Sequence, residues 1–132
     1  MKLFIRAFLS LAVCLLVIPV ALARRPGVPP AISAAGVYDN FTVGKGSGDL
    51  EGMRVVIVPA GGGHYAIVQI AQGGAEDPKP EFVEATVKGL SVSFAVGDEK
   101  FNGTVSAMGL RLKNSAGESQ MLKRKTCASY LK

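Results

Sequence analysis

The chain has 132 residues, 48% of them hydrophobic and 19% charged, and its 15 basic and 10 acidic residues give a net charge of +5. This length suits a single domain whose core is large enough to fold alone. With two cysteines and one histidine, the composition excludes a disulfide-rich scaffold and a typical histidine-based zinc site, which needs three or four converging ligands.

Residues 1–23 have the pattern of a secretory signal peptide. Two basic residues precede an apolar run at residues 8–21, and the run ends in Ala-Leu-Ala at residues 21–23, a small-x-small cleavage signal. The run is shorter than the roughly 20 apolar residues that a membrane-spanning helix needs, which disfavours an uncleaved anchor. We therefore expect an exported protein, either periplasmic or secreted.

Cleavage after Ala23 would remove 23 of the 132 residues and leave 109, and the loss of Lys2 and Arg6 would lower the net charge from +5 to +3. Cys14 would leave as well, and it is a poor lipoprotein site because it lies in the middle of the apolar run. Cys127 would then be the sole cysteine, so we expect no internal disulfide. It is either a small residue near the last strand or a thiol available for an intermolecular bridge.

Proline and glycine mark the beginning of the exported chain. Residues 24–35 contain three prolines and predict an extended lead-in, and residues 36–132 follow as a single β domain. Residues 36–43 predict a first strand. Residues 44–52 contain four glycines and predict a mobile loop.

A β-hairpin is predicted at the centre of the domain. Residues 53–58 and 65–71 are apolar runs of strand length, rich in residues that favour a pleated surface. Between them, residues 59–64 predict the turn, and residues 72–81 predict the loop that follows. This loop and the loop at 44–52 are candidate binding elements, since loops on a rigid scaffold commonly carry binding.

Five further short strands are predicted, at residues 82–88, 90–96, 101–108, 109–113 and 120–125. In the first two of these, apolar and polar residues alternate, which is typical of strands with one buried and one wet face. Seven or eight short strands with turn-length connections and no helical apolar period predict an all-β fold, a small antiparallel meander.

We expect the meander to close, or nearly close, into a barrel, because closure removes the exposed edge strands that invite aggregation. A β-sandwich is the alternative. In its general architecture the pattern resembles the small lipocalin-like barrels. That resemblance concerns the fold alone, and a fold does not fix a function.

The sequence carries no recognisable catalytic motif. His64, the one histidine, follows the glycines of the central turn, and Ser47 lacks the strand–turn–helix setting of a nucleophile. Gly61–Gly63 lack the helix that follows a phosphate-binding loop. The acidic pairs all lie in predicted turns: Asp49 and Glu51, Glu76 and Asp77, Asp98 and Glu99. We therefore expect no catalytic residues, no cofactor and no metal, and a protein that is not an enzyme.

Basic residues gather at the C-terminal end of the chain. Residues 100–132 hold seven basic residues and one acidic residue, whereas residues 24–99 hold six basic and nine acidic residues. If the last two strands lie side by side, five candidate binding residues share a basic face: Arg111, Lys113, Lys123, Arg124 and Lys125. Such a face attracts anionic partners. The alternative is an edge strand whose lysines only keep it soluble.

These patterns lead to a functional hypothesis of two parts. We expect a non-enzymatic binding or envelope-associated protein that contacts a protein or an anionic envelope component through its loops or its basic face. Nucleic acid is not an expected partner, because the face lacks interleaved aromatic residues for base stacking. The alternative is a lipocalin-like carrier of a small apolar ligand, with seven inward candidates: Val55, Ile57, Ile67, Val92, Phe94, Leu110 and Leu112.

Overall fold

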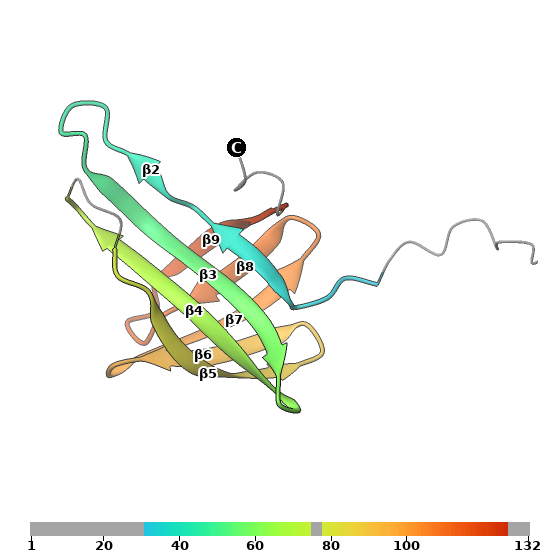
Figure 1. The fold of residues 1–132 in the computed structure, drawn as a ribbon. Coiled ribbons are helices and arrows are strands. Elements are labelled where there is room, and N and C mark those ends of the chain that lie inside the picture. The colour runs from blue at the N-terminus through green and yellow to red at the C-terminus, as the bar shows by residue number, and fades with distance from the viewer. Residues whose placement is uncertain (1–30, 75–77, 127–132) are drawn as a thin grey trace, which may run out of the picture. The chain divides into compact units, whose positions relative to one another are not determined.

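The computed structural model describes residues 31–74 and 78–126. Within these residues the chain forms nine β-strands and no helix (Figure 1). In chain order the strands are β1 (Gly36–Asp39), β2 (Thr42–Val43), β3 (Leu50–Ala60), β4 (Gly63–Gln72), β5 (Glu81–Lys88), β6 (Ser91–Val96), β7 (Glu99–Ser106), β8 (Gly109–Lys113) and β9 (Ser119–Lys125). The signal peptide predicted at residues 1–23, most of the predicted lead-in, and Cys127 lie outside the described residues.

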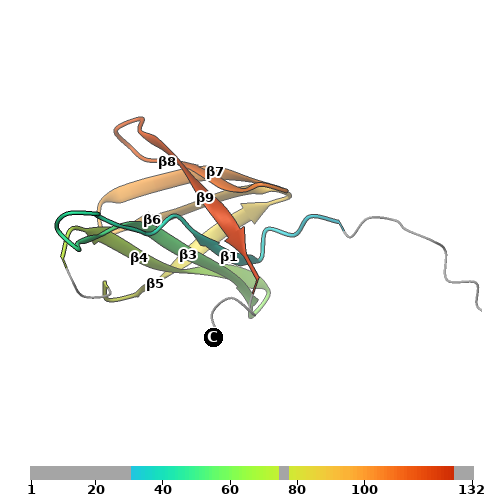
Figure 2. The ribbon, with the colours of Figure 1, turned by 90° about the horizontal axis from the view of Figure 1, so that it is seen from above.

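The strands form one antiparallel sheet that closes on itself. Neighbouring strands follow the order β1-β9-β8-β7-β6-β5-β4-β3-β2, and β1 also pairs with β3. This last pairing closes eight strands into a barrel, while β2 lies beside β3 as an additional strand (Figures 1 and 2). The predicted all-β meander and its closure into a barrel are therefore confirmed, and the alternative β-sandwich is wrong.

The strand predicted at residues 36–43 is divided in two at Asn40. The N–H of Asn40 donates to the carbonyl oxygen of Met53 (3.1 Å), and the Asn40 Oδ1 atom accepts from the N–H of Met53 (2.7 Å). The N–H of Phe41 donates to Oδ1 of Asp39 (3.1 Å). Side-chain oxygens thus replace bonds of the regular ladder, and β2 then resumes the pairing with β3.

The central hairpin has a tighter turn than its sequence suggests. Gly61 and Gly62 alone connect β3 to β4, and both have positive φ, +58° and +81°. This is the backbone geometry of a type I′ turn, whose twist matches that of the flanking strands. The predicted turn at residues 59–64 is therefore too long, and Pro59 and His64 are opposite each other in the ladder. Pro59 is tolerated there because the pairing of β1 with β3 ends two residues earlier.

Alternate residues along each strand point into the barrel and form one apolar cluster. Its buried members on the strands are Tyr38, Met53, Val55, Ile57, Ala66, Val68, Ala85, Val92, Phe94, Phe101, Val105, Leu110, Leu112 and Leu122. The rings of Phe94 and Phe101 stack with centroids 5.3 Å apart. Ile67 is the exception among the predicted inward residues, since it lies between the buried Ala66 and Val68 and is only partly buried on the outer face.

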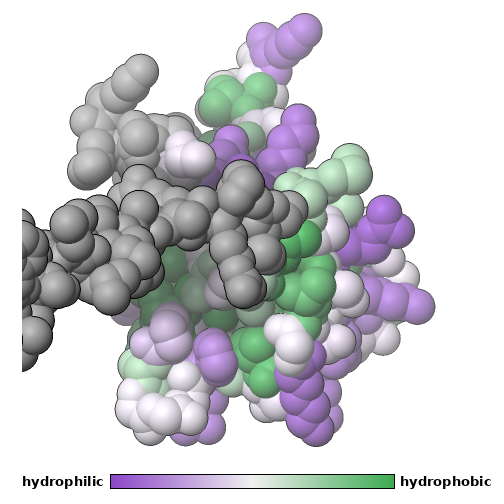
Figure 3. Space-filling view, turned by 90° about the vertical axis from the view of Figure 1, so that its right-hand side faces the viewer, coloured by the Kyte–Doolittle hydropathy of each residue, from purple (hydrophilic) through white to green (hydrophobic). Residues whose placement is uncertain are grey.

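Hydrophilic residues surround the apolar interior. Figure 3 shows them around the rim of one face, with apolar residues towards its middle. In residues 31–74 and 78–126 there is no helix with the length and hydropathy needed to span a membrane.

Candidate functional site

Two rows of polar side chains lie next to each other on the outer face of β5 to β9. The strand register sets the rows, because each residue of a row is the cross-strand partner of the next. The first row consists of Thr86, Ser93, Asn102, Lys113 and Ser119. The second row consists of Lys88, Ser91, Thr104 and Arg111, and it ends at Met121. These residues face outward because their neighbours along each strand, such as Val92 and Leu112, are buried inside the barrel.

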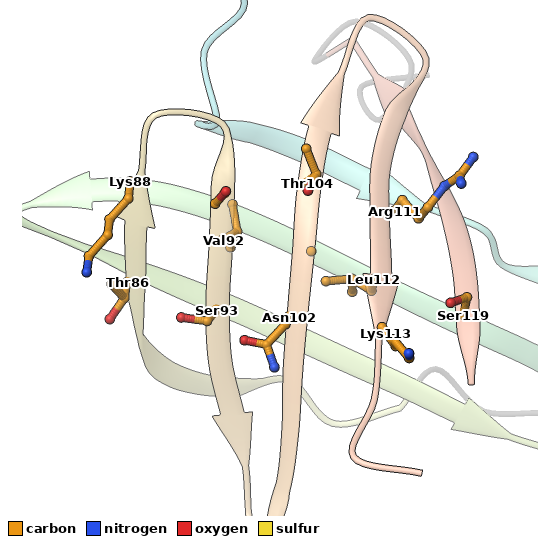
Figure 4. Close-up of a pocket in the computed structure, with 12 residues that line it drawn as sticks. Thr86, Lys88, Val92, Ser93, Asn102, Thr104, Arg111, Leu112, Lys113 and Ser119 are labelled. Atoms are coloured by element: carbon orange, nitrogen blue, oxygen red, sulfur yellow. The ribbon is translucent and has the colours of Figure 1, made fainter. Parts of the chain in front are cut away.

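The two rows line a shallow groove of about 530 Å³ (Figure 4). Between the rows lies its floor, formed by the cross-strand partners Val92, Gly103 and Leu112. The groove is open to solvent and crosses the strands, so it can hold an extended ligand on the barrel surface.

Gly103, in the floor of the groove, lets β7 pack closely against β8. A Cβ atom at this position would lie 2.5 Å from the carbonyl oxygen of Arg111 and 2.7 Å from Cδ2 of Leu112. Real Cβ atoms do not approach backbone so closely, so only glycine permits this packing of β7 on β8. The pairing of β6 with β7 is continuous through Gly103. The strand β7 therefore has no bulge at Gly103.

Among the residues that the structure describes, the lining of the groove carries positive charge and no acidic residue. Lys88, Arg111 and Lys113 are exposed, and the other lining side chains are neutral. Both ion pairs found among the described residues involve Asp39, with Arg54 and with Lys125, and include no residue of the groove. The carboxylate nearest in sequence, that of Glu118, accepts a hydrogen bond from Nδ2 of Asn114 (2.9 Å).

Of the five residues predicted to form a basic face, the structure brings Arg111 and Lys113 together in the groove. Lys123 is exposed on the outer face of β9, beside the groove. Lys125 lies 3.9 Å from Oδ1 of Asp39, at the far end of the same strand. The groove also contains Lys88 of β5, which sequence analysis did not include among the candidates.

Arg124 is not part of the outer face. It follows the inward-pointing Leu122 by two residues, and its guanidinium caps one end of the barrel. Nη2 of Arg124 donates to Oη of Tyr38 (2.7 Å) and to the carbonyl oxygen of Ser33, and Nη1 donates to the carbonyl oxygen of Ala35 (3.2 Å). The role of Arg124 in this structure is therefore to tie β9 to the segment before β1.

Tyr38, which is fully buried, completes this cap. Its hydroxyl donates to the carbonyl oxygen of Ala34 (2.8 Å), and Ala34 is itself buried. Burial raises the pKa of Tyr38 above its ordinary value of 10.0, and the nearby Arg124 charge, with its hydrogen bond, opposes part of that rise. The phenol therefore stays protonated and holds its hydrogen bond at physiological pH.

A second polar network lies on the outer face of β1, β3 and β4. Nε of Arg54 donates to Oδ2 of Asp39 (3.0 Å), and Nη1 of Arg54 donates to Oε1 of Gln69 (3.2 Å). Gln69 in turn donates to the carbonyl oxygen of Pro78 (2.8 Å). This network ties Pro78, shortly before β5, to the outer face of the barrel.

The other sequence candidates do not converge on a reactive centre. His64 lies at the start of β4, opposite Pro59 and Ala85, and not within the turn. Ser47 accepts a hydrogen bond from the N–H of Asp49 inside its own loop (3.2 Å). In the described part of the chain, no three His, Cys, Asp or Glu residues are grouped so that they could hold a metal ion.

Comparison of the chain with protein-family models, with curated proteins and with solved structures found no match in any of the three. Its function is therefore inferred from the groove and the barrel themselves.

Proposed function

We propose that this protein is a non-enzymatic binding protein that holds an anionic envelope polymer in the outer groove of β5 to β9. The observation that carries the proposal is the lining of the groove, in which Lys88, Arg111 and Lys113 stand without a carboxylate. An exposed strip of one charge sign attracts partners of the opposite sign. Lys88 and Lys113 supply flexible ammonium groups, and Arg111 supplies a planar fork that suits carboxylate and phosphate groups.

A polymer suits these exposed cations better than a small anion does. An ion pair at an exposed site contributes only about 0.2–1 kcal/mol. Several such contacts along one chain add up, because the first contact raises the effective concentration of the next anionic group. A polymer that crosses the groove can reach all three cations at once. A folded protein is favoured less, because the described part of the chain gives the groove no aromatic side chain of the kind that anchors protein interfaces.

The interior of the barrel supports an outer site over a carrier function. Tyr38, Leu110 and Leu122 are all 0% exposed and belong to one apolar cluster with the other inward side chains. An apolar ligand would have to displace these side chains, and loss of packed core contacts is costly. We place the protein outside the cytoplasm, in the periplasm or secreted, because of the signal-peptide pattern at residues 1–23.

The experiment is a comparison of charge-matched variants on an immobilised anionic polysaccharide at low ionic strength. R111Q/K113Q removes two charges inside the groove, and K100Q/K123Q removes two exposed charges outside it. We expect R111Q/K113Q to elute at clearly lower salt than K100Q/K123Q, and wild-type retention to fall as salt screens exposed charges. Equal retention of the two variants would mean that general charge, and not the groove, binds the polymer.

A further inference from the structure

We infer that the ligand of the groove is a hydroxyl-rich glycan with two anionic groups set about three strand spacings apart. This inference rests on the proposed function and adds the class of ligand. It follows from the positions of the cations, from the neutral side chains between them and from the lack of aromatic residues among the described residues of the lining.

The cations stand at the two sides of the groove. Lys88 is on β5 and Arg111 is on β8, in the same cross-strand row, and Figure 4 shows them on opposite sides with Lys113 near Arg111. Neighbouring strands are about 4.8 Å apart, so three spacings separate the backbones of Lys88 and Arg111 by about 14 Å. Two anionic groups at that separation are each met by a cation.

The middle of the groove is polar but carries no charge. Ser91, Ser93, Asn102 and Thr104 of β6 and β7 occupy the positions between the cations. Hydroxyl and amide groups both donate and accept hydrogen bonds, as the hydroxyl groups of a sugar do. A uniformly charged polymer such as polyphosphate would place anions over this neutral stretch, where no cation meets them. A glycan with separated charges leaves only hydroxyl groups there.

The spacing of the strands also suits a glycan. A sugar residue extends a polysaccharide chain by nearly the distance between neighbouring strands, so a chain lying across β5 to β8 places about one sugar on each strand. None of the described residues that line the groove is an aromatic residue on which a nucleic acid base could stack. A single-stranded nucleic acid is therefore a poor fit for the groove.

The test compares ligands that differ in length or in charge. The probes are cellotetraose with a carboxylate on each terminal sugar, cellobiose with the same two carboxylates, cellotetraose with one carboxylate, polyphosphate, and vesicles of an anionic phospholipid. We expect the doubly charged tetrasaccharide to bind about fivefold more tightly than either other sugar probe, because only it forms ion contacts on both sides of the groove. Isothermal titration calorimetry gives the affinities.

Variants separate the two sides of the groove from its middle. K88Q is expected to weaken binding of the doubly charged tetrasaccharide about threefold to fivefold and to leave the disaccharide unchanged, while K100Q changes neither. N102A is expected to weaken binding of the tetrasaccharide and not that of polyphosphate, since it removes a hydrogen-bonding group and no charge. Thermal melts of each variant confirm that the barrel is folded.

The outcomes distinguish this inference from the proposed function. Equal affinity for the disaccharide and tetrasaccharide, or polyphosphate or vesicles binding more tightly than the tetrasaccharide, would overturn the glycan assignment. The proposed function would survive such a result if R111Q/K113Q still weakened binding more than K100Q/K123Q. If those two charge-matched variants behaved alike, the groove itself would be rejected as the site.

Discussion

Nη2 of Arg124 lies 2.7 Å from Oη of Tyr38, and this hydrogen bond joins the last strand of the barrel to the first. The hydroxyl of Tyr38 also donates a hydrogen bond to the carbonyl oxygen of Ala34, in the segment before β1. The pair therefore holds β9 and the segment before β1 together, next to the pairing of β1 with β9.

Arg124→Met is expected to destabilise the protein by about 1–3 kcal/mol, because the Tyr38 hydroxyl and two backbone carbonyls lose their charged donor. Lys123→Met is the matched control: it neighbours Arg124 in sequence but points outward and is exposed, and it should cost no more than about 0.5 kcal/mol. Urea unfolding of both variants measures the difference. Equal stability of the two variants would show that the cap is energetically unimportant.

The stability contributed by Tyr38 is expected to fall at high pH. Because the native state raises the pKa of Tyr38 above 10.0, it retains the phenol proton to a higher pH than the unfolded chain does. The contribution of Tyr38 to stability is therefore fully present well below pH 10, and it declines as the pH rises through 10 until the pH passes the folded-state pKa.

Tyr38→Phe isolates this effect, because all other titrating groups are common to both proteins. The free energy of unfolding of the wild type should exceed that of the variant by about 1 kcal/mol at neutral pH. That difference should shrink between pH 9 and pH 11.5, a range about the ordinary pKa of tyrosine. A constant or growing difference across this range would contradict the raised pKa.

Gly103→Ala is expected to destabilise the barrel by about 1–3 kcal/mol, as overpacking of a filled site does. The added methyl group would meet the backbone of Arg111 and the side chain of Leu112. The control is Gly46→Ala, since nothing lies within 4 Å of a Cβ atom at that loop position. Thermal melts should show a lowered Tm for the Gly103 variant alone. A normal Tm for that variant would mean that β7 can move away from β8 without cost.

Asn40→Ala is expected to cost about 1–2 kcal/mol, because the N–H of Met53 loses its acceptor where the ladder is interrupted. Asn40 also donates from Nδ2 to Oε1 of Gln120 (3.2 Å), which links β9 to the first part of the sheet. Asn102→Ala is the control, since Asn102 is exposed on the outer face of β7. Its removal should change the stability by less than about 0.5 kcal/mol. Similar losses in both variants would contradict a special role for Asn40.

Strict alternation made part of the fold predictable from the sequence. In β5 and β6 the apolar residues Ala85, Val92 and Phe94 alternate with polar residues, and the structure places all three inside the barrel. Ile67 was assigned to the wrong face because its whole run is apolar, and such a run has no period that distinguishes inside from outside. Ile67 is opposite Val56 and Phe82, in an apolar part of the outer face.

The candidate site was only partly predictable, for a different reason. Arg111 and Lys113 stand out by their charge, but their proximity to Lys88 depends on the register of four strands, which no local pattern fixes. Arg124 lies between two exposed lysines, and its partner Tyr38 is 86 residues away in the chain. The charged sequence around Arg124 therefore suggested that its side chain faces solvent, whereas in the structure it caps one end of the barrel.

The most direct measurement of the central claim is a map of backbone amide chemical shifts during titration with the doubly charged tetrasaccharide. If the groove binds the ligand, the largest shifts fall on β5 to β8, at residues such as Thr86, Ser93, Asn102 and Arg111, and they weaken in R111Q/K113Q. Shifts concentrated on the outer face of β3 and β4, or among core residues such as Leu110, would contradict a binding site in the groove.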